Sequence, residues 1–361
     1  MRQDGEKSRR GQHFPCIIQH LLLQAKDETT MSPRSIEANA QSTTPATPSA
    51  TPSATHFASD DKKWHSSFSN AEISASTRPN TRLNRRLVSY DEIPDWYQDN
   101  PYIRHGYRPV LQSARACFSS WSYVHNETLN IYTHLVPAAV LLVIGLSYVL
   151  IRLSGRSSDD IGVAVALLVC AVGCLSFSSL YHTLMCHSRS IEAFWLRLDF
   201  IGIILLILGS FISGIYVGFW CETLQRRIYF SMMGSLAAIS IVVVLAPCFQ
   251  GPRWRTLRLL TFVFTGLSGL IPIIHGIVMF GFMQMAKQSG LFYFLAEGGL
   301  FLIGAVVYAT RFPESIRPGT FDIYGSSHQI FHVLVVFATV IHLIGVLDAL
   351  DYNYYNRQCP G

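Results

Sequence analysis

The stretch SSHQIFHVLVVFATVIHLIGV, residues 326–346, decides how the rest of the chain is interpreted. It contains no Asp, Glu, Lys or Arg, and it is long enough to cross a bilayer as one helix. His328 and His332 stand one helical turn apart at its start, so both imidazoles lie on one face. Two imidazoles on one face of a membrane helix are typical of half a metal site, and the other ligands must come from elsewhere.

The composition indicates a membrane protein. Half of the 361 residues are hydrophobic and only 14% are charged, against about a quarter in soluble proteins. The net charge of +5 forms no dense basic stripe, which argues against nucleic-acid binding. The eight cysteines include no CxxC pair, so we expect no disulfide framework.

Seven apolar runs follow the polar first part of the chain. They cover residues 131–151, 161–185, 198–221, 228–249, 259–286, 291–310 and 327–347. Each run has about 20 residues or more, enough for one crossing of a membrane. The sequence therefore predicts an all-α membrane protein built as a seven-transmembrane helix bundle.

The same runs divide the chain into four parts. Residues 1–87 are expected to be a disordered arm, because they are polar and include the low-complexity segment ATPSATPSAT. Residues 88–130 are expected to be a cytoplasmic juxtamembrane segment with an amphipathic helix. Residues 131–350 form the seven-helix, metal-binding domain, and residues 351–361 form a short C-terminal tail.

The basic residues near the ends of the runs predict the orientation. Ten of them flank the N-terminal side of the first run and the second, fourth and sixth loops, and six flank the opposite side. The richer side belongs in the cytoplasm. We therefore expect a cytoplasmic N-terminus and a C-terminus outside. The glycosylation sequon at Asn126 would then face the cytoplasm and stay unused.

This orientation brings other polar residues to the depth of the first two histidines. His182 lies in the last turn of the second helix, and Asp199 lies in the first turn of the third. Ser178 precedes His182 by one turn on the same face. His134 and His187 lie near the same layer and compete as ligands, whereas His275, His342 and Glu297 lie deeper.

Three histidines at a tetrahedral zinc ion leave one position for water, whose pKa the metal lowers to about 7. Asp199 is expected to act as the base and Ser178 to orient the water or stabilise an oxyanion. The alternatives are that the HxxxH pair contributes only polar packing, and that Asp199 pairs with Arg197 or caps its helix.

Several motifs in residues 88–350 are long and specific. They are YDEIPDW, HGYRP, SARACF, NETLNIYTHL, SSLYHTLMCHS, LDFIGI, RFPES and PGTFDIYGSSHQIFHVLVV. With them the chain resembles the progestin and adipoQ receptor family, in its adiponectin-receptor-like, haemolysin-III-related branch that includes fungal homologues. The resemblance implies a cytoplasmic N-terminus and a zinc ion held by His182, His328 and His332, with Ser178 and Asp199 beside it. It selects these ligands over His134 and His187.

The resemblance also implies a function. A similar pattern occurs in alkaline ceramidases, so a receptor acting in lipid metabolism and signalling through hydrolysis of a lipid amide is expected. The alternative is a non-catalytic regulator of zinc or lipid homeostasis with a structural zinc ion. Arg258 stands where the family places an arginine near a lipid cavity, and Phe200 replaces a tyrosine common in relatives.

The expected partners follow from this reading of the resemblance. They are a ceramide or fatty acid within the bundle and an extracellular protein ligand. The expected location is the plasma membrane or an endomembrane, and the sequence does not determine the oligomeric state.

Overall fold

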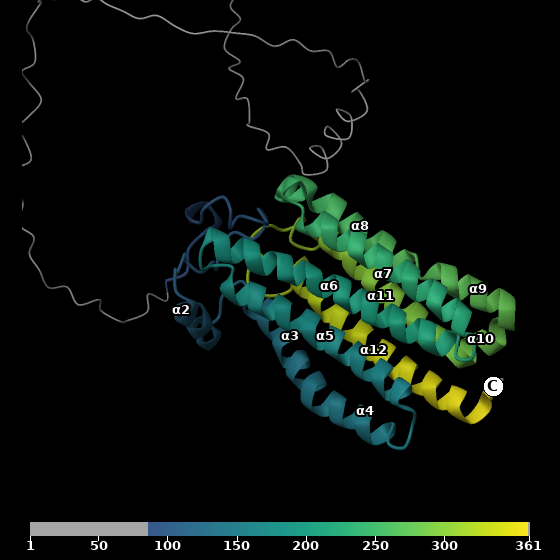
Figure 1. Cartoon of the computed structure of the whole chain (residues 1–361). Helices are drawn as coiled ribbons and strands as arrows, with labels where there is room; N and C mark the ends of the chain where they lie inside the picture. Colours follow the sequence, from purple (N-terminus) through teal and green to yellow (C-terminus); the bar gives the residue numbers. More distant parts are fainter. Residues whose placement is uncertain (1–85, 360–361) are drawn as a thin grey trace, which may run out of the picture. The chain divides into compact units, whose positions relative to one another are not determined.

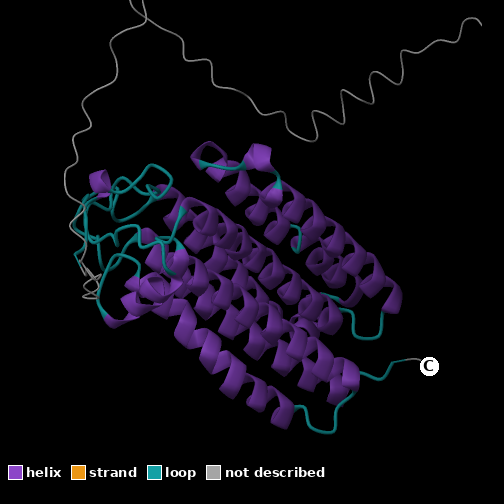
Figure 2. Cartoon of the chain, turned by 60° about the vertical axis from the view of Figure 1, so that its left-hand side comes forward, coloured by secondary structure: helices purple, strands orange, loops and turns teal. Residues whose placement is uncertain are grey.

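The computed structural model describes residues 86–359, so the predicted arm over residues 1–87 lies almost entirely outside the described residues. Within the described range the chain is helical, with one isolated bridge between Val88 and Tyr107 (Figure 2). Seven stretches in this range are long and apolar enough to cross a membrane. The predicted all-α bundle of seven transmembrane helices is therefore confirmed.

The first span joins three helical segments end to end. They are α3 (Thr128–Val140), the π-helical turn η3 (Leu141–Gly145) and α4 (Leu146–Arg152). The other spans are α5 (Ser158–Leu184), α6 (Arg189–Gly218), α7 (Thr223–Leu245), α8 (Arg255–Leu267) with α9 (Leu270–Phe280), α11 (Leu291–Thr310) and α12 (Ser327–Asn356). The short elements are η1 (Tyr90–Glu92), α2 (Ala114–Ser119), η2 (Ser120–Ser122), η4 (Pro247–Phe249), η5 (Pro252–Trp254) and α10 (Phe282–Ser289).

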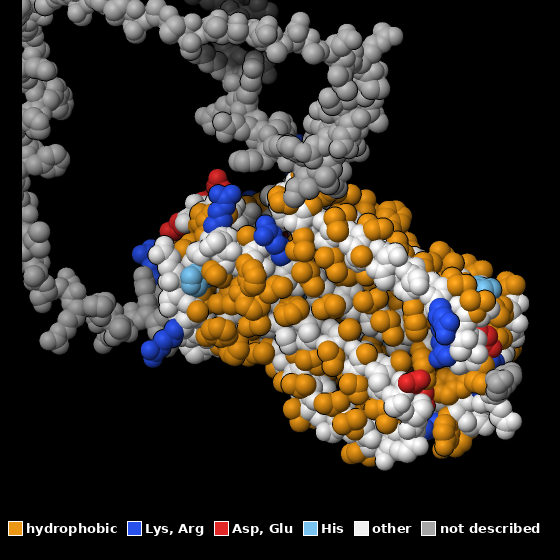
Figure 3. All heavy atoms as spheres, in the orientation of Figure 1, with side chains coloured by type: hydrophobic (Ala, Val, Ile, Leu, Met, Phe, Trp, Pro, Cys, Tyr) orange, Lys and Arg blue, Asp and Glu red, His pale blue; other side chains and the backbone are white. Residues whose placement is uncertain are grey.

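The outer surface of the bundle carries large apolar side chains. Val143, Ile151 and Val278 are 65%, 76% and 78% exposed. Figure 3 shows hydrophobic side chains across the middle of one face, with the charged side chains gathered toward its two ends. Such a broad apolar surface is costly in water and is suited to the acyl chains of a bilayer.

The helices α5 and α6 approach each other closely because α6 presents glycines to α5. A Cβ atom added at Gly202 would lie 3.0 Å from the Cα atom of Cys174, and one added at Gly209 would lie 2.8 Å from the Cβ atom of Cys170. Small residues allow this kind of contact between membrane helices. Cys170 and Cys174 are free thiols in this interface.

The juxtamembrane segment is less helical than predicted. Its helix α2 has only six residues, and η2 extends it by one turn. Residues 123–127 then form a non-helical connection to α3. The side chain of Ser113 caps α2 by accepting a hydrogen bond from the backbone of Ala116. Figure 1 places α2 and the C-terminal end of α12 at opposite ends of the bundle.

The helix α12 continues beyond its predicted end at residue 347, because charged residues on its last turns find partners on the first span and the loop after it. Arg152 forms ion pairs with Asp348 at 2.9 Å and with Asp351 at 2.8 Å. Arg156 forms a further pair with Asp351 at 2.6 Å. These contacts hold the last turns of α12 against the end of α4.

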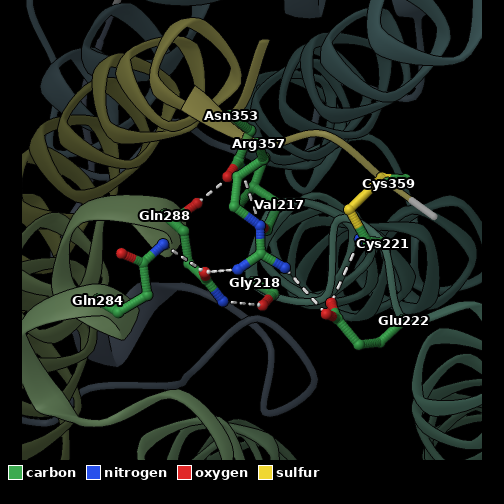
Figure 4. Close-up of a disulfide and its surroundings, with 9 residues drawn as sticks. All are labelled: Val217, Gly218, Cys221, Glu222, Gln284, Gln288, Asn353, Arg357 and Cys359. Carbon is green, nitrogen blue, oxygen red and sulfur yellow. Dashed lines mark hydrogen bonds and ion pairs between the residues drawn. A yellow bond between two sulfur atoms is a disulfide. The ribbon is translucent and has the colours of Figure 1, made fainter. Parts of the chain in front are cut away.

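A disulfide between Cys221 and Cys359 joins the loop after α6 to the segment after α12 (Figure 4). Arg357 binds Glu222 beside it at 2.8 Å, and Asn353 donates hydrogen bonds to the backbone of Val217 and Gln288. The expectation that the cysteines form no disulfides was therefore wrong. The partners are 138 residues apart in sequence, and their spacing carries no local signal.

Candidate metal centre

Three histidines meet at the end of the bundle that also holds α2. His182 comes from the last turn of α5, and His328 and His332 come from the first two turns of α12. One ligand nitrogen from each lies within 4.8 Å of the others. The Nε2 atoms of His182 and His328 are 3.1 Å apart. We call these three residues the histidine cluster; the structure brings together all three predicted ligands.

The start of α12 is fixed by side chains that bind its free backbone amides. The Gln329 carboxamide oxygen accepts hydrogen bonds from the backbone of Gly325 at 2.6 Å and of Ser326 at 3.4 Å. Glu314 accepts a third from the backbone of Ser327 at 2.8 Å. Satisfying these amides stabilises the first turn of the helix. The first turn of α12 therefore holds His328 in a defined position.

The protonation of the cluster fits a metal ion. His182 donates from Nδ1 to the Glu127 carboxylate at 2.8 Å, and His332 donates from Nδ1 to the carbonyl of Asn130 at 3.1 Å. In the neutral form of each residue, the lone pair is therefore on Nε2. Nitrogens around a tetrahedral zinc ion lie about 3.3 Å apart, given Zn–N bonds of about 2.0–2.1 Å. The 3.1 Å between the Nε2 atoms of His182 and His328 suits a shared cation.

The two predicted catalytic residues lie beside this cluster. Asp199, in the first half of α6, interacts electrostatically with His182 and lies close to the hydroxyl of Ser178. The Ser178 side chain is 2% exposed, and its oxygen has no hydrogen-bond partner within 3.5 Å among the described residues. The Asp199 carboxylate is a polar neighbour of this hydroxyl, so the two side chains are suited to bind a further group at this site.

The competing histidines take different positions. The ring of His134 stacks on His332 with centroids 3.7 Å apart and planes at 4°, and its Nε2 atom approaches the carbonyl of His332 at 3.3 Å. It packs against a predicted ligand and does not belong to the cluster. His187 lies in the loop after α5 and contacts Ser188.

Arg258 and Phe200, predicted near a lipid cavity, contact each other. The Arg258 guanidinium lies 5.2 Å from the centre of the Phe200 ring, in a cation–π arrangement. The same guanidinium donates to the carbonyls of Phe249 and Gly251 at 2.9 and 3.1 Å. An apolar pocket lined by Phe211, Phe219 and Phe294 lies farther along α6, against α9, α10 and α11, and includes neither Arg258 nor the histidine cluster.

Glu127 is a residue of this site that the sequence interpretation missed. Its carboxylate is 9% exposed and accepts hydrogen bonds from His182 and from the side chains of Asn130 at 2.7 Å and Asn126 at 3.1 Å. Burial alone would raise the pKa of Glu127, but the hydrogen bonds from His182 and Asn130 lower it to about 2. The carboxylate is therefore charged at neutral pH.

Arg108 is a second residue that the sequence interpretation missed. It is fully buried and donates to the carbonyls of His182 at 2.5 Å and Thr183 at 3.0 Å, and to the Ser120 hydroxyl at 2.9 Å. Cations are stabilised at the C-terminal end of a helix, where carbonyls lack partners. Arg108 thus holds the turn of α5 that carries His182.

The deeper polar residues form separate networks, as expected. His342 binds Glu297 at 2.8 Å and the Ser213 hydroxyl at 2.9 Å, linking α6, α11 and α12. His275 binds the hydroxyl of Tyr229 at 2.7 Å. Neither histidine reaches the histidine cluster.

Comparison with known proteins gives one consistent result. Residues 122–343 match the haemolysin-III-related family. The chain is 39% identical over 274 residues to the adiponectin receptor protein of Drosophila melanogaster, covering 76% of this chain and 62% of the relative. It is also 39% identical over 279 residues to the ADIPOR-like receptor IZH2 of Saccharomyces cerevisiae, covering 77% of this chain and 88% of the relative.

A nematode relative is similar to this chain to the same degree. The progestin and adipoQ receptor-like protein 1 of Caenorhabditis elegans is 38% identical over 276 residues. The matched region spans only 62% and 63% of the fly and nematode relatives, less than two thirds of each. The family match over residues 122–343 includes His182, His328 and His332.

Proposed function

Because this chain belongs to the haemolysin-III-related family of adiponectin-receptor-like membrane proteins, we propose that it is a receptor-like protein with an intramembrane zinc site that hydrolyses a lipid amide. The substrate class is ceramide-like, and the products are a fatty acid and a sphingoid base. The observation that carries the proposal is the buried histidine cluster with a carboxylate and a buried hydroxyl beside it.

Zinc is the metal that this donor set favours. Three neutral imidazoles without a thiolate are a common ligand set of catalytic zinc, whereas structural zinc sites generally have four protein ligands. Zinc held there would supply a water nucleophile at neutral pH and would polarise a carbonyl group.

The residues of this chain divide the remaining tasks. Asp199 lies where it can accept the proton of the attacking water and return it to the departing amine. The Ser178 hydroxyl, which lies beside Asp199, would donate a hydrogen bond to the amide oxygen. The water oxygen joins the acyl carbon, the carbon–nitrogen bond breaks, and the amine leaves with the proton that Asp199 carried.

The proposed orientation places this site near the cytoplasmic face and the C-terminus outside. Disulfides persist on the oxidising side of a membrane, and the Cys221–Cys359 bond lies at the C-terminal end of α12. At the other end, Cys117 and Cys186 are free thiols with sulfurs 3.6 Å apart. The Cys221–Cys359 bond at the end of α12 supports a C-terminus on the outer side, as inferred from the basic residues.

The proposed ligand contacts are of two kinds. Arg258 and Phe200 would line the path of the lipid, because the Arg258 guanidinium of α8 lies over the Phe200 ring, one residue after Asp199 in α6. A protein ligand would bind on the outer side, by analogy with relatives named as adiponectin receptors.

Purified protein incubated with a ceramide tests the reaction. Zinc content is measured on each sample, and the released fatty acid is measured by mass spectrometry. We expect product from the wild type and a loss of at least 100-fold in Asp199→Asn, with zinc retained. Equal product from both proteins, or none from either at full zinc occupancy, would refute the hydrolytic reaction. The second result, together with a lower thermal stability after zinc removal, would indicate a structural zinc ion in a non-catalytic regulator.

A further inference from the structure

Glu127 lies outside the membrane spans, one residue before α3, yet its carboxylate reaches the histidine cluster. Its Oε2 atom accepts from His182 Nδ1 at 2.8 Å and from the side chain of Asn130 at 2.7 Å. Its Oε1 atom accepts from the side chain of Asn126 at 3.1 Å. A carboxylate is a pure acceptor, so it satisfies all three donors at once.

Asn130 links the same turn to a second ligand. Its side chain donates to Glu127, and its backbone carbonyl accepts from Nδ1 of His332 at 3.1 Å. The start of α3 thereby binds the Nδ1 atoms of two histidines that come from two other helices. In both cases the hydrogen bond fixes the tautomer with the lone pair on Nε2, which is the atom that a metal would need.

We propose that Glu127 is a positioning residue of the metal site, which holds the His182 imidazole in its ligand tautomer and orientation and strengthens it as a donor. This inference rests on the proposed metal site and not on the proposed hydrolysis. Asn130 supports Glu127 and gives His332 its corresponding contact.

The bundle contains a second Glu–His pair with the same interaction, which lies outside the histidine cluster. Glu297 accepts from Nδ1 of His342 at 2.8 Å, and both residues are buried. This pair shares the residue types, the atoms and the distance with Glu127 and His182. If Glu127 contributed only a buried hydrogen bond, its replacement and that of Glu297 would have equivalent effects.

The experiment measures zinc affinity by competition with a chelator, and thermal unfolding, on full-length protein in detergent. Glu127→Gln keeps the shape and one acceptor oxygen but removes the charge, and we expect zinc binding about 10-fold weaker. Glu127→Ala removes the acceptor, and we expect about 100-fold weaker binding. Glu127→Asp retains a carboxylate and is expected to recover part of the affinity. Glu297→Gln is expected to lower the unfolding temperature and to leave zinc affinity unchanged.

The possible outcomes distinguish the positioning role of Glu127 from the proposed lipid hydrolysis. Wild-type zinc affinity in Glu127→Gln and Glu127→Ala overturns the positioning role, as does an equal loss in Glu297→Gln. A wild-type protein that binds no zinc overturns the metal site and this inference together. A wild type that binds zinc but releases no fatty acid overturns only the hydrolysis, and the affinity series still tests Glu127.

Discussion

Replacing Arg108 by alanine tests the claim that a buried cation holds the end of α5. The side chain is fully buried and makes three hydrogen bonds, to two backbone carbonyls of α5 and to the Ser120 hydroxyl. Each bond from a charged donor contributes about 1.5 kcal/mol at the low end of the usual range. Water that enters the space left by the side chain would offset part of this sum. The expected destabilisation is therefore about 3–4 kcal/mol.

For a chain of this size such a loss corresponds to an unfolding temperature lower by roughly 10 °C. The measurement is thermal unfolding in detergent, with limited proteolysis of residues 111–127 as a local probe. Arg115→Ala is the matched control, because Arg115 lies exposed on α2. Arg108→Lys keeps the charge but lacks the planar guanidinium with its several N–H donors. We expect its unfolding temperature to fall about half as much as that of Arg108→Ala. If Arg108→Ala and Arg115→Ala unfold within 1 °C of each other, the reasoning about α5 is refuted.

Three further predictions concern other parts of the structure. Reducing agent or the substitution Cys221→Ser should free the segment after α12, and the protein should then migrate more slowly on a non-reducing gel. The zinc content should not change, because the ion pair and hydrogen bonds at that end of the bundle remain. Gly290→Ala should lower the free energy of unfolding by about 1–3 kcal/mol, because the φ of Gly290 is +63° and an added Cβ would lie 2.8 Å from a backbone oxygen of α12. Gly298→Ala is the control and should leave the free energy of unfolding nearly unchanged, because no atom lies within 4 Å of the added Cβ. His182→Ala should bind no stoichiometric zinc, and a chelator that lowers the unfolding temperature of the wild type should have no effect on this variant.

The sequence predicted the features that depend on periodicity and length. The apolar runs gave the seven spans because a bilayer requires about twenty apolar residues in each helix. The one-turn spacing of His328 and His332 placed them on one face, and the count of spans brought His182 to the same depth. These residues lie on regular helices, so their positions follow from geometry along the chain.

The residues that the sequence interpretation missed depend on tertiary contacts. Glu127 stands within Asn126-Glu127-Thr128, which was interpreted as an unused glycosylation sequon. Asn126 is in fact 5% exposed, and its side chain binds Glu127. Arg108 lies in an irregular segment, where no period indicates which face is buried. A buried charge in such a segment is found only when the partners that compensate it are seen.

The fifth span shows that hydropathy does not predict where a helix ends. The apolar run 259–286 was predicted as one span, whereas α9 ends at Phe280 and α10 begins at Phe282 after Gly281, whose φ is +80°. Phe282, Met283 and Met285 extend the apolar run past this turn, although α10 as a whole is much more polar than α9. The boundaries of an apolar run therefore predict a crossing better than they predict a helix.

The Cys221–Cys359 bond also bears on how the protein is made. Cys221 follows the third span and Cys359 follows the seventh, so an even number of crossings separates them. The two thiols lie on the same side of the membrane when all four intervening helices have been inserted. A molecule that skips one crossing during translocation would leave them on opposite faces, unable to react. The disulfide therefore forms in correctly inserted molecules, and the fraction of molecules in a cell extract that carry it reports how often insertion succeeds.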